Sequence, residues 1–324
     1  MPRQARLDSP GTLHHVIVRG IEKRNIVDDD QDRNNFVFRM GQVALQTKTI
    51  IYAWALMTNH VHILLRSGPS GLPKYMRRLL TGYAVSYNRR HQRFGHLFQN
   101  RYKSILCDED SYFTELVRYI HLNPLRAKLV KNLAELEKYP WCGHGAVVGR
   151  FNHEWQDRDH ILSWFGKREG AARGAYQKYV QEGISKGRRP ELVGGGLIRS
   201  QGGWAQVISM RRRGGGEISD ERILGDGEFV EKAMREAQTH LKSHYELKKK
   251  QREMDKFLQS ICNRAGISVK ELASGSRRGR VSRLRSHLAA RMIEDYGLTL
   301  AEVARHLGVS TSGISKLMIR GGSE

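Results

Sequence analysis

Two short stretches of this chain carry residues whose types and spacing could do chemistry on a phosphate. His60 and His62 stand two apart in a β-rich segment, residues 58–65. Side chains two apart on a strand share a face, so the two imidazoles would lie side by side. Downstream, Tyr119 and Asn123 are four apart, which places a phenol and an amide on one face of a helix. Two imidazoles and an amide oxygen can hold a divalent metal ion, and a tyrosine beside it is a candidate nucleophile.

Each of these features also has a plainer explanation. Two histidines on a strand are more often polar residues on an exposed face than metal ligands. Tyr119 would equally suit a helix boundary, with its hydroxyl bonded to a carbonyl. Asn123 precedes Pro124, which is a turn signal, although the proline would also restrict how the asparagine is held. Tyr102 and Tyr112 are rival nucleophiles on the sequence alone.

The charge balance favours a polyanionic partner. The 324 residues contain 55 Lys and Arg against 33 Asp and Glu, a formal net charge of +22 and a pI near 10.2. Such an excess attracts nucleic acid through counterion release. A membrane surface is the rival polyanion, but neither end carries an amphipathic basic helix or a lipidation signal. We therefore expect DNA or RNA as the partner and no membrane. No Walker-type glycine loop is present, which argues against ATP-driven work.

The cysteines and the N-terminal residues indicate an intracellular protein. Cys107, Cys142 and Cys262 match neither a zinc spacing nor a disulfide framework, so we expect reduced thiols. Residues 1–6 lack the apolar segment of a signal peptide, and the longest apolar runs are too short to span a bilayer. We expect a cytoplasmic, nucleoid-associated protein.

The hydrophobic pattern of the first 130 or so residues predicts the element order β-α-β-β-α-β-α. Predicted strands cover 13–19, 50–57, 60–66 and 104–107, and predicted helices cover 32–48, 73–90 and 109–128. This order is typical of a ferredoxin-like α+β unit, an antiparallel sheet with helices packed on it. The third helix has a core stripe with Tyr119 at its edge; the stripe comprises Phe113, Leu116, Val117 and Ile120.

The rest of the chain divides into a glycine-rich stretch and a regular C-terminal part. We expect a helix over 161–181, loop or linker over 183–227, and a charged helix over about 228–250. A later helix carries an apolar face at Leu284, Leu288, Met292 and Ile293. Thr299 then caps a helix to His306, and Gly308 turns the chain into a helix over 311–318. The spacing suits a helix-turn-helix, with a small residue at Ala304 and a buried one at Ile314.

The N-terminal residues carry a resemblance to a known family. His60-Val61-His62 with Tyr119 and Asn123 resembles the HUH endonucleases that use a single tyrosine, and more closely the REP-associated tyrosine transposases of bacteria. The similarity covers about residues 1–150. It includes Pro2-Arg3, Pro10-Gly11, His15-Val16 and Arg101-Tyr102-Lys103-Ser104.

The resemblance implies an enzyme that nicks and joins single-stranded DNA bearing a hairpin. His60, His62 and Asn123 would hold Mg²⁺ or Mn²⁺ against the scissile phosphate. Tyr119 would attack, giving a 5′-phosphotyrosine and a free 3′-hydroxyl that can later reverse the step on another strand. Bond energy is conserved in such a reaction, which agrees with the missing ATP site. Candidate DNA contacts in this part are Arg3, Arg6, Arg77, Arg78, Arg101 and Lys103.

From about Asp255 onward the chain resembles a second family, the DNA-binding domain of the replication initiator DnaA. Val269-Lys270-Glu271-Leu272, Arg277-Arg278 and the helix-turn-helix pattern carry the likeness. It implies duplex binding, with Arg277, Arg278 and Arg280 on phosphates and with Thr311, Ser312, Ser315 and Lys316 near the major groove. Residues 311–315 depart from the initiator's pattern, so its sequence specificity does not transfer. A basic three-helix domain that binds a protein is the alternative.

These observations predict a two-domain DNA strand-transfer enzyme. The nuclease domain would cover 1–150, a helical and glycine-rich connecting region 151–227, and a helix-turn-helix domain 228–324. Its partner would be single-stranded DNA with a hairpin, plus duplex through the C-terminal domain, and a homodimer is left open. The main alternative is a non-catalytic DNA-binding regulator derived from a transposase, and the next is an RNA-processing factor.

Overall fold

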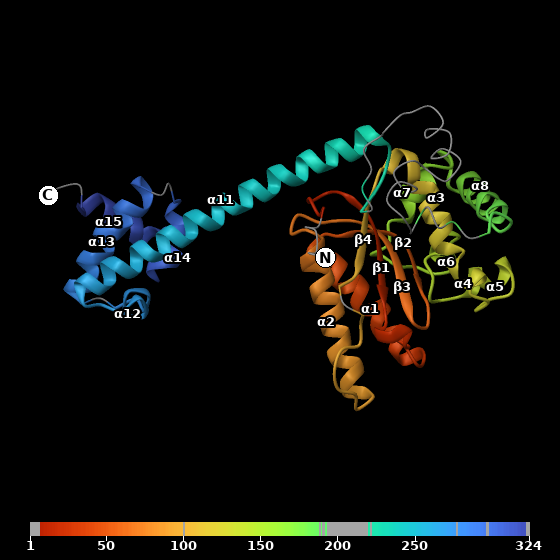
Figure 1. Ribbon diagram of the computed structural model, residues 1–324, viewed down its shortest axis with the longest axis horizontal. Coiled ribbons are helices and arrows are strands. Elements are labelled where there is room, and N and C mark those ends of the chain that lie inside the picture. Colours follow the sequence, from red (N-terminus) through yellow and green to blue (C-terminus); the bar gives the residue numbers. More distant parts are fainter. Residues whose placement is uncertain are drawn as a thin grey trace. The chain divides into compact units, whose positions relative to one another are not determined.

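The fold is described from a computed structural model of the chain (Figure 1). The described residues are 7–99, 101–187, 189, 192, 220, 222–276, 278–295 and 298–321, with backbone alone for 238–252, 294 and 318–321. Contacts divide the chain into two compact units, Met1–Gln238 and Thr239–Glu324. Each unit is described by itself below.

The first unit is built on a sheet of five strands in the order β2-β3-β1-β4-β5. The strands β1 (Leu13–Arg19), β2 (Ile50–Leu56), β3 (His60–Arg66) and β4 (Lys103–Cys107) lie within a residue of their predicted limits. These four strands pair with one another antiparallel, in the ferredoxin-like order expected from the sequence. The predicted α+β class is confirmed.

The fifth strand corrects the prediction that residues 183–227 are only loop or linker. β5 (Ile223–Leu224) pairs parallel to β4, and the Leu106 N–H donates to the Arg222 carbonyl at 2.8 Å. Both strand residues are fully buried. Two residues are too few to show a periodic pattern, so only the pairing with β4 identifies this strand.

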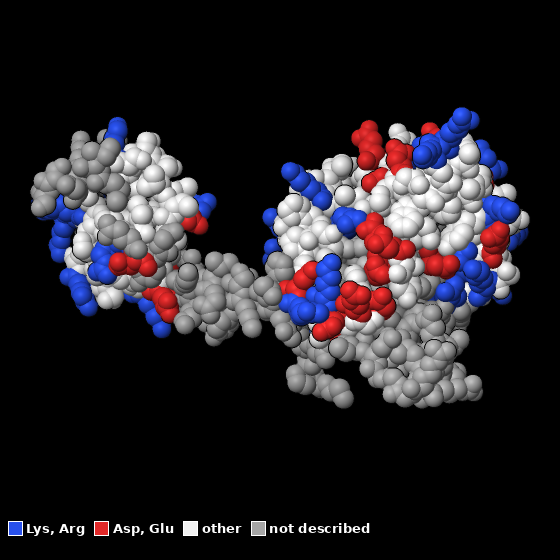
Figure 2. All heavy atoms as spheres, turned by 90° about the horizontal axis from the view of Figure 1, so that it is seen from above, with Lys and Arg blue, Asp and Glu red and all other residues white. Residues whose placement is uncertain are grey.

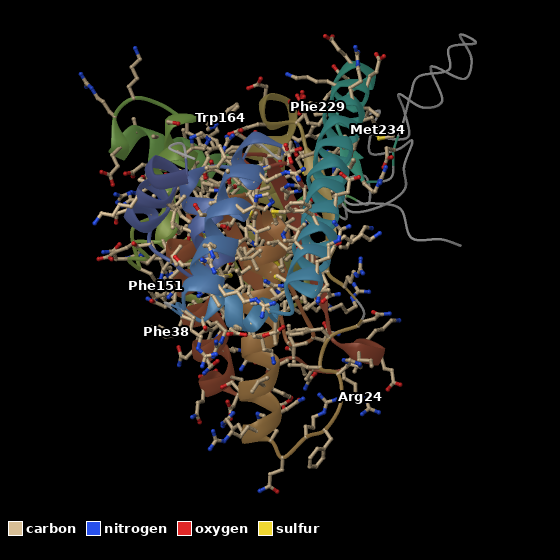
Figure 3. All side chains as sticks on the ribbon, turned by 90° about the vertical axis from the view of Figure 1, so that its left-hand side faces the viewer. Arg24, Phe38, Phe151, Trp164, Phe229 and Met234 are labelled. Atoms are coloured by element: carbon tan, nitrogen blue, oxygen red, sulfur yellow. The ribbon has the colours of Figure 1, made fainter. Side chains whose placement is uncertain are left out.

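Two long helices cover one face of the sheet, α1 (Asp30–Thr47) and α2 (Leu72–Arg90) (Figure 1). The Asp29 side chain caps α1 by accepting from the Asp32 N–H at 3.0 Å. The two helices pack against alternate residues of the strands, among them Val16, Val18, Trp54, Val61, Ile63 and Leu65. At the outer surface of α1, the Phe38 side chain is 68% exposed (Figure 3).

The opposite face is covered first by α3 (Glu109–His121), whose predicted core stripe is buried. The predicted helix to residue 128 is wrong beyond His121, because a short helix, α4 (Asn123–Arg126), follows after Leu122. Pro124 lacks an N–H and cannot continue the hydrogen-bond ladder of α3. Asn123 therefore begins a new helix and does not sit on α3.

Further helices cover the same face as α3: α5 (Leu133–Lys138), α6 (His144–Val147), α7 (Arg158–Ser163) and α8 (Glu169–Glu182). The predicted helix over 161–181 is two helices, because Gly166 between them has a φ of +153°, outside helical geometry. Tyr176 and Val180 of α8 are fully buried in the core that α3 forms with the sheet. Residues 158–182, which we expected in the connecting region, are thus part of the packed first unit.

The edge strand β2 is not open to pairing with another chain along its length. The Leu56 N–H donates to the Trp141 carbonyl, and the Gly143 N–H donates to the Trp54 carbonyl, both at 2.9 Å. Gln156 is buried beside the same edge, and its side-chain amide donates to the Tyr52 carbonyl. Residues 141–157 thus occupy the edge groups that would otherwise invite β-sheet association.

The second unit is a helical core around the C-terminal half of α11 (Gly227–Ala265). It also contains α12 (Val269–Ala273), α13 (Gly279–Glu294), α14 (Leu300–Leu307) and α15 (Thr311–Gly321). Thr299 and Glu302 form a reciprocal capping box at the start of α14, and Gly308 ends it in the left-handed conformation. Val303, Leu307 and Ile314 are fully buried in the core. The limits of α14 and α15 agree with the sequence pattern, whereas the charged helix predicted over about 228–250 continues to Ala265.

The three cysteines are free and buried, as expected. No helix among the described residues is long and apolar enough to cross a membrane.

Buried histidines make the first unit sensitive to acid. Both ring nitrogens of His14 contact hydroxyls, Thr12 Oγ1 at 2.8 Å and Ser104 Oγ at 3.1 Å, and His144 Nδ1 lies 2.8 Å from the Tyr176 hydroxyl. Burial lowers the pKa of His14 to about 3 and that of His144 to about 4, from an ordinary value of 6.5. Because these pKa values are depressed in the folded state, the unfolded chain binds the protons first.

We therefore predict that the free energy of unfolding falls as the pH drops below about 6.5. Each such histidine should contribute about 1.4 kcal/mol per pH unit until the folded pKa is reached. Urea unfolding at several pH values between about 4.5 and 7, followed by tryptophan fluorescence, measures this slope. His144→Asn keeps a donor near Tyr176 without titrating. The slope of its unfolding free energy against pH should therefore be smaller by the contribution of one histidine. A slope unchanged by this variant would contradict the assignment.

Gly308 allows a test of the turn between α14 and α15. It has a φ of +63°, and a Cβ added there would lie 1.8 Å from the Ala273 carbonyl oxygen. Gly308→Ala should destabilise the second unit by more than about 1 kcal/mol, through strain and displaced backbone. A Cβ added at Gly313 in α15 meets only side-chain atoms, Ser310 Oγ at 3.3 Å and Val309 Cβ at 3.8 Å, so Gly313→Ala should stabilise the helix by up to about 1 kcal/mol. Hydrogen exchange of the α14 amides should change in opposite directions in the two variants, and equal effects would refute the argument.

Candidate functional site

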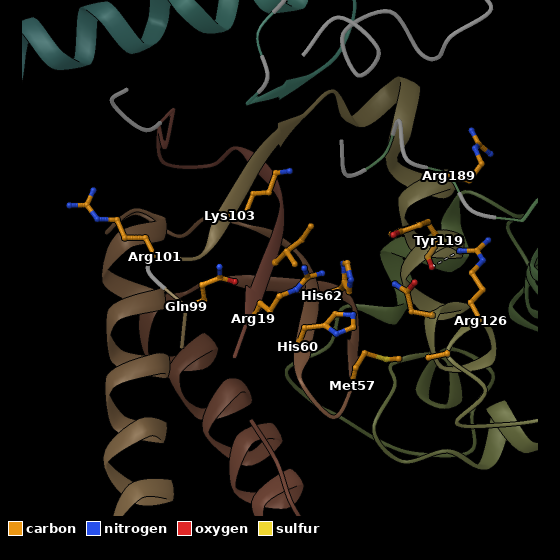
Figure 4. Close-up of a pocket in the computed structure, with 13 residues that line it drawn as sticks. Arg19, Met57, His60, His62, Gln99, Arg101, Lys103, Tyr119, Arg126 and Arg189 are labelled. Atoms are coloured by element: carbon orange, nitrogen blue, oxygen red, sulfur yellow. Dashed lines mark hydrogen bonds between the residues drawn. The ribbon is translucent and has the colours of Figure 1, made fainter. Parts of the chain in front are cut away.

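A pocket of about 700 Å³ in the first unit collects most of the chemically suitable residues (Figure 4). Its floor is the face of β1, β3 and β4 that points towards α3, and its wall comes from α3 and α4. The lining residues are Ile17, Arg19, Met57, His60, His62, Gln99, Arg101, Lys103, Tyr119, Asn123, Arg126, Ala127 and Arg189.

Strand register assembles this floor. Ile17 of β1 stands opposite His62, and Arg19 stands opposite His60. On its other side Ile17 stands opposite Lys103 of β4. Residues that face each other across neighbouring strands share a face of the sheet, so these side chains converge although they are far apart in sequence.

The two histidines of β3 lie side by side (Figure 4), and the Nδ1 atom of each contacts a residue outside the pocket lining. Their ring centroids are 5.2 Å apart. His60 Nδ1 lies 2.6 Å from Asn59 Oδ1, and His62 Nδ1 lies 2.9 Å from Nε2 of the buried His15. Burial lowers the pKa of His60 to about 4 and that of His62 well below 6.5. Both imidazoles are therefore neutral at pH 7, the form that can bind a metal ion.

Tyr119 lies across the pocket from these histidines. Its ring centroid is 5.9 Å from that of His62 in an edge-on arrangement, and 6.0 Å from that of His15. The rival tyrosines are elsewhere. Tyr102 packs with the core on the opposite face of the sheet. Tyr112 stands two helical turns away on α3, where burial, and after it the nearby Asp108 and Asp226, raise its pKa. Tyr119 is the tyrosine that lines the pocket among the described residues.

Asn123 brings a polar group that lacks a partner. Its Nδ2 atom is buried and makes no hydrogen bond, in a residue that lines the pocket. A buried amide nitrogen without a partner is costly, and an oxygen of a bound phosphate would supply an acceptor. Rotation of the amide by 180° would present Oδ1 at the same place, since the two ends have the same shape.

The pocket is lined by cations and, within the described part of the chain, by no carboxylate. Arg126 is half-buried; its guanidinium lies 5.3 Å from the centroid of the Tyr119 ring and donates to the Tyr119 carbonyl at 3.2 Å. Its Nε atom is buried without a partner. Arg189 is paired with Glu115 at 3.1 Å, so part of its charge is compensated. Figure 2, by contrast, shows a face of this unit where acidic and basic side chains mix.

Several predicted DNA contacts do not lie at this pocket. Arg77 and Arg78 are exposed on α2, which covers the other face of the sheet. Arg101 and Lys103 do line the pocket. Arg3, Arg6 and Arg277 lie outside the described residues.

In the second unit the predicted contacts are at the surface. Thr311, Ser312 and Lys316 are exposed on α15, and Ser315 is partly exposed. Arg278 is exposed and lies 3.5 Å from Glu271, and exposed Arg280 donates to the Ala265 carbonyl. Arg285 is different, because it is buried and donates to the carbonyls of Leu272 and Ser276. It holds the fold together and is not available to a phosphate.

A second group of possible metal ligands, Asp28, Asp32 and His91, lies on the other face of the sheet beside α1 and α2. A cation is already present there, since Arg90 donates to Asp32 at 2.6 Å and also to Asp29. His91 Nε2 lies 2.8 Å from Asp32, and the Tyr87 hydroxyl donates to Asp28. This network satisfies the carboxylates without a metal ion.

The sequence did not single out several residues of the site: Arg19, Arg126, Arg189, and the contacts that His15 and Asn59 make with the histidine pair. Arg19 and His15 stand on alternate positions of β1, a period-2 signal that would have placed them on one face. Arg126 comes from a short helix, and Arg189 from a part of the sequence without a hydrophobic period. No local sequence signal therefore predicts that either residue lies at the site.

The sequence of residues 10–123 matches the family described as Transposase IS200 like. The match spans β1 to the first residue of α4, including His60, His62, Tyr119 and Asn123. Residues 10–123 are therefore similar in sequence to the IS200-like transposases.

Two solved structures are also similar to part of this chain. One is a REP-associated tyrosine transposase bound to a REP hairpin, 16% identical, covering 48% of this chain and 91% of that chain with a TM-score of 0.40. The other is a putative transposase from Deinococcus radiodurans R1, 18% identical, covering 35% and 92%, with a TM-score of 0.26. No curated protein matches this chain significantly.

Proposed function

We propose that the protein cleaves and rejoins single-stranded DNA bearing a hairpin, with Tyr119 as the nucleophile and a divalent metal ion held by His60, His62 and Asn123. One observation carries the proposal: these four residues meet in one pocket that is lined by five cations. The match of residues 10–123 to a transposase family supports the same reaction class. A DNA partner also agrees with the net charge of +22, and we propose that the protein is associated with the nucleoid.

The residues present fit a divalent ion. The two histidines are neutral, both Nδ1 atoms are engaged, and the Asn123 amide lacks a partner. Imidazole nitrogen and amide oxygen, completed by phosphate oxygens, suit Mn²⁺ or Mg²⁺. When bound, the ion would neutralise charge on the phosphate. His60 and His62 would fix its place because both are anchored on the central strand β3.

Tyr119 would then form a bond from its phenolic oxygen to phosphorus while the bond from phosphorus to the 3′-oxygen breaks. The phenol proton passes to solvent, and the released 3′-oxygen takes up a proton. The product is a 5′-phosphotyrosine, whose ester can be attacked by the 3′-hydroxyl of another strand. Arg126, beside the ring and half-buried, would orient the phosphate and lower the energy of the developing charge.

The second unit would hold duplex DNA. Its α14 and α15 are joined by a tight turn, and Thr311, Ser312 and Lys316 are exposed on the second of these helices. Exposed Arg278, Arg280 and Arg283 could contact phosphates. We infer that this unit positions the protein at a structured target while the first unit acts on a single strand.

The nucleophile can be tested with Tyr119→Phe. The variant should form no covalent protein–DNA adduct on a hairpin-bearing oligonucleotide with a single-stranded flank, while its affinity for that DNA stays nearly unchanged, because only one oxygen is removed. Denaturing gels with labelled DNA detect the adduct. Tyr112→Phe, two turns away on α3, is the matched control and should keep full yield. Adduct formation by Tyr119→Phe would assign the chemistry to another residue, and a requirement for 2′-hydroxyls would favour an RNA substrate.

The metal site can be tested by titrating Mn²⁺ into metal-free protein. His60→Ala and His62→Ala should each weaken binding by more than about tenfold, or 1.4 kcal/mol, and should lose cleavage with it. Asn123→Ala should be milder, since water can replace a neutral amide ligand. Asp32→Asn should bind Mn²⁺ like the wild type, because Arg90 already occupies that carboxylate network. Full cleavage in excess chelator would overturn the metal assignment.

The division of labour can be tested by ending the chain at Gln238. This limit keeps Val230 and Ala233, which are buried against Leu106 in the first unit. Cleavage of unstructured single strands should persist, whereas affinity for duplex-bearing targets should fall and the salt dependence of binding should become less steep. Fluorescence anisotropy at several salt concentrations measures both. An unchanged affinity and salt slope on every duplex-bearing target would instead favour a protein-binding role for the second unit.

A further inference from the structure

His15 touches the histidine pair from the neighbouring strand. Ile17 of β1 stands opposite His62, so His15 lies diagonally across from it on the same face of the sheet. The two rings are stacked with centroids 5.2 Å apart, and His15 Nε2 lies 2.9 Å from His62 Nδ1. His15 is fully buried and His62 is 5% exposed. Such surroundings favour two neutral rings that share one proton between these nitrogens.

The direction of this hydrogen bond follows from the other side of His15. His15 Nδ1 lies 3.3 Å from the Leu192 carbonyl oxygen, which can only accept. Nδ1 of His15 therefore carries the proton, and Nε2 of the same neutral ring has a lone pair and accepts. His62 must then donate from Nδ1. The remaining nitrogen of His62, Nε2, is left without a proton and with a lone pair.

The same logic fixes His60 by a different route. The Asn59 side-chain nitrogen donates to the Lys23 carbonyl at 3.1 Å, so the orientation of this amide is set. Its Oδ1 then faces His60 Nδ1 at 2.6 Å and can only accept. His60 also carries its proton on Nδ1 and keeps a lone pair on Nε2. Two separate backbone carbonyls thus give the pair the same tautomer.

We propose that His15 is a positioning residue that holds His62 in the Nδ1–H tautomer and so presents its Nε2 lone pair to a divalent metal ion. This inference rests on the proposed function, since it concerns the same site. Without the acceptor at His15, His62 could carry its proton on Nε2 and would have to shift it before binding an ion. Groups that orient a metal-binding histidine in this way change metal affinity about 10- to 100-fold when removed.

The chain offers a matched control in His14. It is the neighbouring residue of β1, is also fully buried, and is held by two hydroxyls, but it lies on the other face of the sheet. Replacing His14 by Phe removes a buried histidine from the same strand without touching His62. Any general effect of such a change on the sheet will therefore appear in both variants, and an effect on the metal site will appear in one.

The experiment measures Mn²⁺ affinity by calorimetry and the tautomer of His62 by long-range ¹H–¹⁵N correlation spectra of the histidine rings, on full-length metal-free protein. His15→Phe should weaken Mn²⁺ binding by about 10- to 100-fold and should lose the Nδ1–H form of His62. His14→Phe should change neither. His15→Gln, whose amide oxygen can accept from His62, should recover most of the affinity and the tautomer.

The outcomes separate this inference from the proposed function. If His62→Ala loses Mn²⁺ binding but His15→Phe binds as well as His14→Phe, the metal site stands and the role of His15 is refuted. If the wild type binds no Mn²⁺ at all, the metal part of the proposed function fails, and the His62 tautomer in His15→Phe still decides the role of His15. If His15→Phe does not fold, His15→Gln is compared with the wild type. Loss of the Nδ1–H form of His62 with an unchanged Mn²⁺ affinity would then refute the role of His15.

Discussion

Strand β3 has packed helices on both of its faces, and this sandwiched position determines what each of its residues can do. Val61, Ile63 and Leu65 are fully buried against α1 and α2, and the alternating residues face α3. A shift of the strand by one residue would turn the apolar side chains towards the pocket and the histidines into the apolar core. The burial of three aliphatic side chains, each contributing on the order of 2 kcal/mol, therefore holds His60 and His62 in their register.

The pocket combines neutral histidine rings with positively charged side chains, and neither kind of group is often buried. The buried histidines are tolerated because each has a hydrogen-bond partner at Nδ1, which offsets part of the cost of removing the ring from water. Arg126 is less well satisfied, since burial lowers its pKa and its Nε has no partner. A site that keeps a guanidinium Nε and an amide nitrogen without partners next to a tyrosine suits an anionic ligand, because such a ligand could accept hydrogen bonds from both groups.

Hydrogen bonds between residues far apart in the sequence determine which segments belong to the first unit. Residues 141–157 close the β2 edge, and β5 adds a parallel strand beside β4. The start of α11 then buries Val230 next to Leu106. The sheet that carries the pocket is therefore supported by segments from well beyond residue 150. In the second unit, Arg285 shows that a basic residue can serve the fold, whereas Arg278 and Arg280 remain at the surface.

The sequence by itself determined the strands, the main helices, the shared face of His60 and His62, and the place of Tyr119 at the edge of the core stripe of α3. These features depend on local periods of 2 and 3.6 residues, which a single segment displays without its partners. Only the tertiary structure decided that Tyr119, and neither Tyr102 nor Tyr112, meets the histidines, that Asn123 opens a new helix, and that residues 223–224 join the sheet. It alone brought together His15 and His62, which are 47 positions apart, and placed Arg126 over the Tyr119 ring. Such contacts depend on strand register and helix packing between distant segments, and no local pattern encodes them.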